Sequence, residues 1–191
     1  MAKMYFYYAA MNAGKSTNLL QANHNYTERG MKTEIFTSFL DNRYSCGEVT
    51  SRLGIKSKAT MYDKDFNFFE FMQDRKDTSC ILVDESQFLT KEQVEQLAYV
   101  VDKLNIPVLA YGLRTDFQGN LFEGSMRLLA IADSIKELKT MCFCGSKAIM
   151  SARVDKNGNV LKCGEQVEIG GNELYLPLCR KHFVNGITSF K

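Results

Sequence analysis

Proline, net charge and long apolar runs are all scarce in this sequence, and each absence excludes a class of protein. Two prolines in 191 residues, with no low-complexity tract, argue against long disordered linkers. A formal net charge of +2 is too balanced to indicate nucleic-acid binding by itself. No apolar run approaches the roughly 20 residues that span a bilayer. The apolar stretch near the N-terminus ends in a polar loop, unlike a signal peptide. We therefore expect a cytoplasmic protein that binds neither membrane nor nucleic acid.

The length and the cysteine content set the next expectations. With 45% hydrophobic residues, the 191 residues can bury a proper core, either as one medium domain or as one domain with a small appendage. The sequence has six cysteines. Disulfides are rare in the cytoplasm, so we expect some of these cysteines to bind a metal instead.

A phosphate-binding loop is predicted near the N-terminus. The aromatic residues 5–8 are typical of a buried strand, residues 16–29 indicate a helix, and the segment 13–16 (Ala-Gly-Lys-Ser) lies between them. This is the layout of a P-loop, whose backbone N–H groups and helix N-terminus bind phosphates. Lys15 can then reach the β- and γ-phosphates of ATP, and the Ser16 hydroxyl can hold Mg²⁺. The residues predicted to bind ATP here are Ala9, Ala10, Met11, Asn12, Ala13, Gly14, Lys15 and Ser16.

One position departs from the full pattern G-x-x-x-x-G-K-[ST], because Ala9 stands where the first Gly is expected. A Gly would adopt a positive φ angle there at lower cost than an Ala. The alternative interpretation is a chance Gly-Lys-Ser at the start of a helix. The strand before the loop and the helix after it favour the P-loop.

A second motif typical of P-loop enzymes, an acidic residue that holds Mg²⁺, follows a buried strand predicted at residues 80–83. The strand runs into Asp84-Glu85-Ser86-Gln87-Phe88, and an acid at the end of such a strand lies beside the phosphate loop of a P-loop enzyme. Adjacent side chains of an extended segment point in different directions. We therefore assign Asp84 to Mg²⁺ and Glu85 to the general base that faces a second substrate. The alternative, a solvated helix cap, is weakened by the presence of the P-loop.

Strands and helices alternate along the first part of the chain. Besides the elements already named, we predict strands at 33–37 and 107–111, helices at 65–74, 90–104 and 122–132, and a loop at 41–52. Thr90 and Gln93 have the spacing of a capping box. Alternation of this kind predicts an α/β fold, with a mostly parallel sheet and helices on both faces.

The character of the sequence changes near residue 139. Helical periodicity fades, cysteines and glycines cluster, and residues 155–159 (Asp-Lys-Asn-Gly-Asn) indicate a hairpin turn. We therefore divide the chain into a nucleotide-binding domain of residues 1–138 and a C-terminal domain of residues 139–191. The second piece is too small to rely on its own hydrophobic core.

Four candidate zinc ligands lie in two pairs on either side of the predicted hairpin: Cys142, Cys144, Cys179 and His182. Tetrahedral structural zinc accepts three Cys and one His, and a metal would hold together a piece that lacks a core. The Cys-x-Cys spacing is tighter than the usual two to four intervening residues. Reduced, buried cysteines are the alternative.

The other cysteines and His24 are not assigned to a metal. Cys80 fits a buried position in an apolar strand. Cys46 and Cys163 are placed in loops without a partner at a useful spacing. His24 lies on the predicted first helix and is interpreted as a surface or packing residue rather than a ligand.

Taken together, these motifs resemble the thymidine kinases shared by many bacteria, the animal cytosol and some large DNA viruses. The resemblance covers nearly the whole chain. It depends on the order and spacing of segments 11–17, 41–44, 84–88, 111–117, 142–144, 169–175 and 179–182. Two features depart from the family pattern: Ala9, and a ligand set of Cys-x-Cys plus Cys-x-x-His where many members carry four cysteines.

The resemblance implies a P-loop (RecA-like) parallel-sheet domain and a small zinc-ribbon-like C-terminal domain with structural Zn²⁺. It implies that ATP, assisted by Mg²⁺, phosphorylates the 5′-hydroxyl of thymidine and of deoxyuridine. It also implies a homotetramer, feedback inhibition by thymidine triphosphate, and a loop before Cys179 that closes over the nucleoside as a lasso.

The resemblance also assigns individual residues. Ser86, Gln87 and Arg43 match the nucleotide site, where Arg43 would offset charge on the transferred group. The residues that match the thymine pocket are Met11, Leu113, Phe117 and Tyr175, and those that match the lasso backbone are Gln166, Val167, Glu168, Ile169 and Gly170. An apolar, aromatic pocket suits a methylated pyrimidine. Without the resemblance, ordinary core packing would be the interpretation of Met11, Phe117 and Tyr175.

Two other classes of protein carry some of the same motifs. Nucleic-acid-translocating ATPases combine a P-loop, an Asp-Glu-x-Gln stretch and a zinc knuckle, but this chain lacks a second motor domain and a basic stripe. A zinc-ribbon binding module with a degenerate nucleotide site is disfavoured, because Lys15, Ser16, Asp84 and Glu85 are all present.

Overall fold

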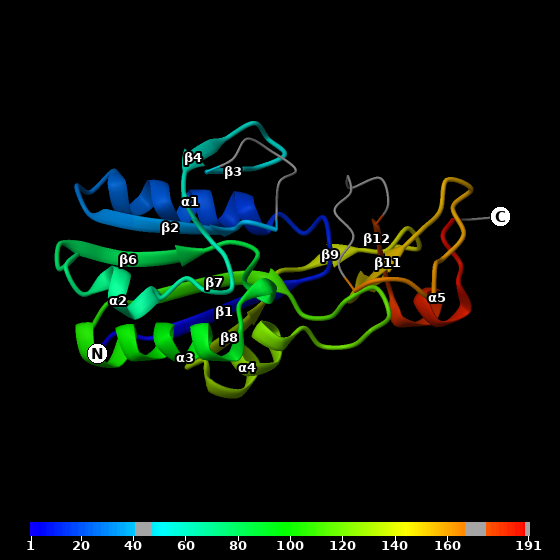
Figure 1. Ribbon diagram of the computed structural model, residues 1–191. Coiled ribbons are helices and arrows are strands. Elements are labelled where there is room, and N and C mark those ends of the chain that lie inside the picture. Colours follow the sequence, from blue (N-terminus) through cyan, green and yellow to red (C-terminus); the bar gives the residue numbers. More distant parts are fainter. Residues whose placement is uncertain (41–46, 167–174, 190–191) are drawn as a thin grey trace.

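A six-stranded sheet forms the centre of the larger part of the molecule (Figure 1). The structure is a computed structural model, and it describes residues 1–40, 47–166 and 175–189. The strand order is β5-β2-β6-β7-β1-β8, and every pairing between neighbours is parallel. The strands are β1 (Met4–Ala9), β2 (Lys32–Ser38), β5 (Thr60–Tyr62), β6 (Thr78–Val83), β7 (Val108–Leu113) and β8 (Ser134–Glu137). The predicted α/β fold is confirmed.

Helices cover both faces of this sheet (Figure 1). One face carries α1 (Lys15–Thr27), and the other carries α2 (Phe68–Met72), α3 (Lys91–Tyr99) and α4 (Glu123–Ile131). The alternation along β6 shows why two layers form. Ile81 and Val83 pack with the cluster on the α3 side, whereas Cys80 and Leu82 pack with the cluster on the α1 side. Successive side chains of a strand point to opposite faces of the sheet. An unbroken apolar run therefore contributes buried side chains to both the α1 side and the α3 side.

The capping box predicted before α3 is present. The Thr90 hydroxyl accepts a hydrogen bond from Gln93 N (3.2 Å), and the Gln93 side chain accepts one from Thr90 N (3.1 Å). Beyond Tyr99 the chain continues as a π-helix, η2 (Val100–Leu104), so the predicted helical extent is confirmed. The helix predicted at residues 65–74 is shorter, because the Asn67 side chain caps its start by accepting from Glu70 N (3.0 Å).

The loop predicted at residues 41–52 is wrong in its described part. Strands β3 (Glu48–Thr50) and β4 (Lys56–Lys58) form an antiparallel hairpin, whereas residues 41–46 lie outside the described residues. The strands are short and mostly polar, so they carry no alternating pattern that a sequence could reveal. Val49 is 2% exposed and packs in the cluster beneath α1, which anchors the hairpin to the sheet.

The C-terminal part is built from short elements that lie beyond β8 (Figure 1). They are β9 (Thr140–Met141), β10 (Lys147–Ala148), β11 (Met150–Arg153), β12 (Tyr175–Leu178) and α5 (Arg180–Asn185). Strand β12, which pairs antiparallel with β11, was not predicted. The predicted turn at residues 155–159 is present, with Asp155 N donating to Asn159 O (2.9 Å) and Gly158 at φ +80°.

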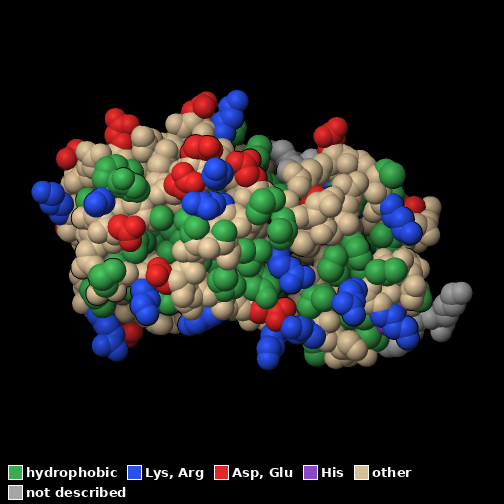
Figure 2. All heavy atoms as spheres, turned by 90° about the horizontal axis from the view of Figure 1, so that it is seen from below, with side chains coloured by type: hydrophobic (Ala, Val, Ile, Leu, Met, Phe, Trp, Pro, Cys, Tyr) green, Lys and Arg blue, Asp and Glu red, His purple; other side chains and the backbone are tan. Residues whose placement is uncertain are grey.

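The outer face of α2, α3 and α4 is seen in Figure 2. Acidic and basic side chains are interspersed across this face, with apolar side chains between them. This distribution agrees with the small net charge of the sequence. Within residues 1–40, 47–166 and 175–189, the structure has no helix long and apolar enough to cross a membrane.

Candidate active site and metal centre

The loop between β1 and α1 has the backbone conformation of a tight phosphate loop. Gly14 caps α1 at φ +76°, and Asn12 also has a positive φ, +66°. Ala9 instead ends β1 in register with Leu113, and its φ is not positive. Because Ala9 is extended, the missing first Gly of the sequence pattern imposes no strain on this backbone.

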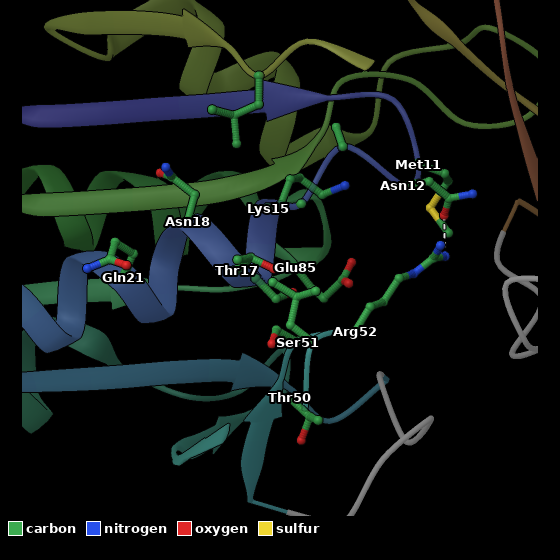
Figure 3. Close-up of a pocket in the computed structure, with 15 residues that line it drawn as sticks. Met11, Asn12, Lys15, Thr17, Asn18, Gln21, Thr50, Ser51, Arg52 and Glu85 are labelled. Atoms are coloured by element: carbon green, nitrogen blue, oxygen red, sulfur yellow. Dashed lines mark hydrogen bonds between the residues drawn. The ribbon is translucent and has the colours of Figure 1, made fainter. Parts of the chain in front are cut away.

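A cavity of about 660 Å³ lies over this loop and the N-terminal turn of α1 (Figure 3). Its walls are the phosphate loop, the first turns of α1, the β3–β4 hairpin, Glu85 and Leu138. The volume lies in the range of small-molecule and cofactor sites. Lys15 lines the cavity while its side chain is largely buried, and its Nζ lies 3.4 Å from Ala10 O.

Ser16 and Asp84 meet at the carboxyl end of the parallel strands, beside the phosphate loop. The Ser16 hydroxyl donates to Asp84 Oδ2 (2.8 Å), and Glu85 N donates to Asp84 Oδ1 (3.0 Å). Burial, aided by the neighbouring Glu85 carboxylate, raises the pKa of Asp84 to about 7. A divalent cation would offset this cost, and a hydroxyl with a carboxylate is the oxygen donor set that Mg²⁺ prefers.

Glu85 has a strained backbone and a fixed side chain. Its φ is +51°, the left-handed region that a non-glycine residue rarely adopts. The Tyr62 hydroxyl donates to Glu85 O (2.9 Å), and the Gln87 side-chain amide donates to the Glu85 carboxylate. The carboxylate still lines the cavity (Figure 3). The strain therefore aims an acidic group at the phosphate loop.

Gln87 connects Glu85 to the end of β7. Leu113 N donates to the Gln87 side-chain oxygen (2.9 Å), so one buried amide holds both the carboxylate and the strand end. Gly112 leaves room for this arrangement, because a Cβ there would lie 2.5 Å from the Ser86 hydroxyl and 2.9 Å from Gln87 N. The Gln87 side chain thus points into the protein interior.

Three of the predicted nucleoside-pocket residues gather around Arg153, which the sequence analysis missed. Arg153 Nε donates to the Tyr175 hydroxyl (3.0 Å), and the guanidinium carbon lies 3.8 Å from the centre of the Phe117 ring. Arg153 Nη2 also donates to Gln166 O (3.4 Å). An arginine buried among these residues gave no sequence signal, since an isolated Arg in a strand is usually exposed.

Two contacts join this group to the larger part of the chain. The Gln166 side-chain amide donates to Asp116 Oδ2 (3.0 Å), and Met11 N donates to the Ser151 hydroxyl (3.0 Å). Met11 thus lies where the phosphate loop meets β11. Arg43, Val167, Glu168, Ile169 and Gly170 lie outside the described residues.

The four predicted metal ligands come together in the C-terminal part. The ligand atoms of Cys142, Cys144, Cys179 and His182 all lie within 4.8 Å of one another. His182 Nδ1 is 3.3 Å from Cys142 Sγ and 3.5 Å from Cys179 Sγ. Hydrogen bonds from Ser146 lower the pKa of the Cys144 thiol to about 7, which favours the metal-binding thiolate. The donor set fits tetrahedral zinc.

The remaining cysteines and His24 lie where they were predicted, except for one outside the described residues. Cys80 is fully buried in β6, Cys163 is exposed in a loop, and His24 is exposed on α1. Cys46 lies outside the described residues.

The fold and the site define a class of protein: an α/β P-loop protein with a phosphate loop, an acid at the end of the neighbouring strand, and a Cys₃His cluster. Comparison with known proteins identifies the family within this class of P-loop proteins. The family model for thymidine kinase matches residues 2–183. A thymidine kinase from Shewanella oneidensis is 58% identical over 96% of this chain and 97% of its own. One from Zymomonas mobilis is 55% identical over 99% of this chain and 100% of its own. The chain belongs to the thymidine kinase family.

Proposed function

We propose that this protein transfers the γ-phosphoryl group of ATP to the 5′-hydroxyl of thymidine, and of deoxyuridine. Family membership supports the reaction. The structural observation that carries the proposal is the Glu85 carboxylate, which lines the same cavity as the phosphate loop. A simple phosphate-binding module would have no need of an acid there, since a carboxylate repels phosphate.

In the proposed reaction, each residue has one role. The phosphate loop, residues 9–16, binds the ATP phosphates, and Lys15 offsets their charge. Ser16 and Asp84 would hold Mg²⁺, which supplies further charge neutralisation when bound. Glu85 accepts the proton of the 5′-hydroxyl as O5′ bonds to the γ-phosphorus. The bond from the γ-phosphorus to the bridging oxygen breaks, and ADP leaves with that electron pair.

The other residues keep their proposed roles in binding. Ser86, Gln87 and Arg43 complete the nucleotide site, with Gln87 contributing through its backbone because its side chain is engaged with Glu85 and Leu113. The proposed nucleoside site comprises Met11, Leu113, Phe117, Tyr175 and residues 166–170. The network around Arg153 supports a shared location for Phe117, Gln166 and Tyr175.

The C-terminal domain, residues 139–191, is proposed to be held together by one Zn²⁺ on Cys142, Cys144, Cys179 and His182. The close approach of the four ligand atoms supports this site. The end of β8 at Glu137 and the separate apolar cluster of the C-terminal part support a boundary after residue 138. A homotetramer, feedback inhibition by thymidine triphosphate and a cytoplasmic location are proposed from family membership alone.

A coupled assay of ATP turnover tests the proposed function directly. Purified protein is assayed with Mg²⁺ and ATP, adding thymidine, single-stranded DNA, or neither. We expect thymidine alone to stimulate turnover, with one thymidine 5′-monophosphate formed per ADP. Stimulation by DNA would indicate a nucleic-acid-dependent ATPase. No turnover in any mixture would indicate a binding module.

A further inference from the structure

The cavity over the phosphate loop contains a second cationic side chain, Arg52, to which the reaction above gives no role. Arg52 lies in the turn of the β3–β4 hairpin, and backbone hydrogen bonds fix the conformation of this turn. Ser51 N donates to Ile55 O (2.8 Å), and Gly54 N donates to Ser51 O (3.0 Å). Ser51 is 3% exposed, and Val49 two residues earlier is packed beneath α1. The base of the Arg52 side chain is therefore held by the folded core.

The Arg52 side chain reaches from the hairpin toward the phosphate loop (Figure 3). Its Nη2 donates to the side-chain oxygen of Asn12, a residue of the loop itself. Arg52, Asn12, Lys15 and Glu85 all line the one cavity. The guanidinium thus links the β3–β4 hairpin to the phosphate loop through Arg52 and Asn12, which are 40 residues apart in the sequence.

The partner of Arg52 is an uncharged amide. Within the described residues, no carboxylate forms an ion pair with Arg52. A guanidinium presents five N–H donors in a planar fork that matches phosphate oxygens, and one amide oxygen uses few of them. Among the described residues of the cavity lining, Lys15 supplies the other positive charge. The cavity therefore offers two cations and a phosphate loop to an anion.

We propose that Arg52 binds oxygens of the phosphoryl group in transfer, the γ-phosphoryl of ATP before the reaction and the 5′-phosphate of the nucleotide product after it. This inference rests on the proposed function. Figure 3 draws Lys15, Glu85 and Arg52 around the same cavity, so both cations and the proton acceptor line the space in which the transfer would take place. As O5′ bonds to the γ-phosphorus and ADP leaves, charge on the equatorial oxygens lies between the two cations.

The test compares Arg52→Ala and Arg52→Lys with wild type and with Lys58→Ala. Lys58 is an exposed cation on strand β4 of the same hairpin, outside the cavity lining. We expect Arg52→Ala to lower kcat about 10²–10³-fold, at or just below the lower end of the roughly 10³–10⁵-fold that arginine fingers contribute. Arg52→Lys should retain an intermediate rate, because it keeps the charge and loses the fork. Lys58→Ala should match wild type.

Binding measurements separate this role from a structural one. Affinity for thymidine, which carries no phosphate, should stay unchanged in Arg52→Ala, whereas affinity for thymidine 5′-monophosphate should fall about tenfold or more. Millimolar ethylguanidinium should restore part of the kcat of Arg52→Ala and leave wild type and Lys58→Ala unaffected.

Three outcomes would overturn the inference. The first is an Arg52→Ala enzyme with more than a third of the wild-type kcat and unchanged product affinity. The second is a raised KM for ATP with unchanged kcat, which would assign Arg52 to a part of ATP that is not transferred. The third is a loss of thymidine affinity equal to that for the monophosphate, which would indicate a displaced hairpin. Failure of the proposed function is distinguishable, because wild type itself would then lack thymidine-dependent turnover.

Discussion

The two parts of this molecule are stabilised in different ways. Among the described residues of the sheet part, seventeen buried residues form the cluster on the α3 side and eight form the cluster on the α1 side. In the C-terminal part, the described cluster has four buried members: Cys142, Ala148, Ala152 and Leu178. Burial of apolar surface is sufficient to stabilise the folded sheet part. The C-terminal part buries so little apolar surface that a metal cross-link is the expected source of its stability. The ligands would be Cys142, Cys144, Cys179 and His182.

The proposed phosphate site lies on the sheet part alone, whereas the proposed nucleoside site takes Met11, Leu113 and Phe117 from the sheet part and its other residues from the C-terminal part. The phosphate loop, Ser16, Asp84 and Glu85 lie on the sheet part, where β1, α1 and β6 fix their backbone. Arg153, Gln166 and Tyr175 lie on the C-terminal part. Phosphoryl transfer should therefore depend on packing of the sheet, and nucleoside binding on the integrity of the zinc cluster.

Loss of the metal should have the largest effect. We expect one zinc per chain by elemental analysis, and we expect Cys142→Ser or strong chelation to abolish thymidine phosphorylation, because the C-terminal part then loses its cross-link. His182→Cys is the matched control, since thiolate and imidazole are both competent zinc ligands. A fully active and folded protein without metal would contradict the structural role.

Glu85→Gln should lower kcat by about 10²–10⁴-fold, the contribution of a well-placed general base. The amide cannot accept the 5′-hydroxyl proton, yet it has nearly the same shape. Equilibrium binding of ATP and of thymidine should be retained and must be measured separately, since a folding defect would mimic the loss. Retention of more than about a third of the wild-type kcat would remove Glu85 from the role of base.

Gln87→Met should have a smaller effect on the same step. The change leaves the partly buried Leu113 N–H without its acceptor and frees the Glu85 carboxylate from a donor. We expect about 1–3 kcal/mol less stability to unfolding, and about a tenfold lower kcat because Glu85 is less well oriented. Gln73→Met, at the exposed end of α2, is the matched control. Equal kcat values for the two variants would show that Gln87 does not orient Glu85.

Cysteine alkylation should distinguish buried from exposed thiols without changing stability. Burial raises the pKa of the Cys80 thiol to about 12. Because the pKa is raised, Cys80 stays protonated and unreactive at pH 8, and its thiolate forms only near pH 12. Mass-spectrometric mapping after brief iodoacetamide treatment at pH 8 should find Cys163 modified and Cys80 intact. Comparable labelling of both residues would show that β6 opens readily.

The parts of the structure that sequence could predict are those with a strong local signal. The strand, loop and helix around Lys15, the Thr90 capping box and the paired Cys/His ligands each follow from residue types at fixed spacing. The β3–β4 hairpin was missed because its strands are three residues long and mostly polar. Arg52 was missed with it.

Other features of the site depend on neighbours that are distant in the sequence. The direction of the Gln87 side chain is set by β7, which lies beside β6 only in the folded sheet. The positive φ of Glu85 gives no signal, since no glycine marks it. Arg153 is buried because Phe117 and Tyr175 enclose it. Such features follow from the packing of the whole chain rather than from local pattern.

The most direct test of the contrast between the two parts is calorimetric binding of a non-hydrolysable ATP analogue and of thymidine, before chelation, after chelation and after zinc is restored. We predict that the chelated protein still binds the ATP analogue within about threefold of its original affinity, while thymidine binding is lost and returns with zinc. Loss of both affinities together, or retention of both, would contradict the claim that the sheet part holds the phosphates on its own, whereas nucleoside binding also requires the C-terminal part.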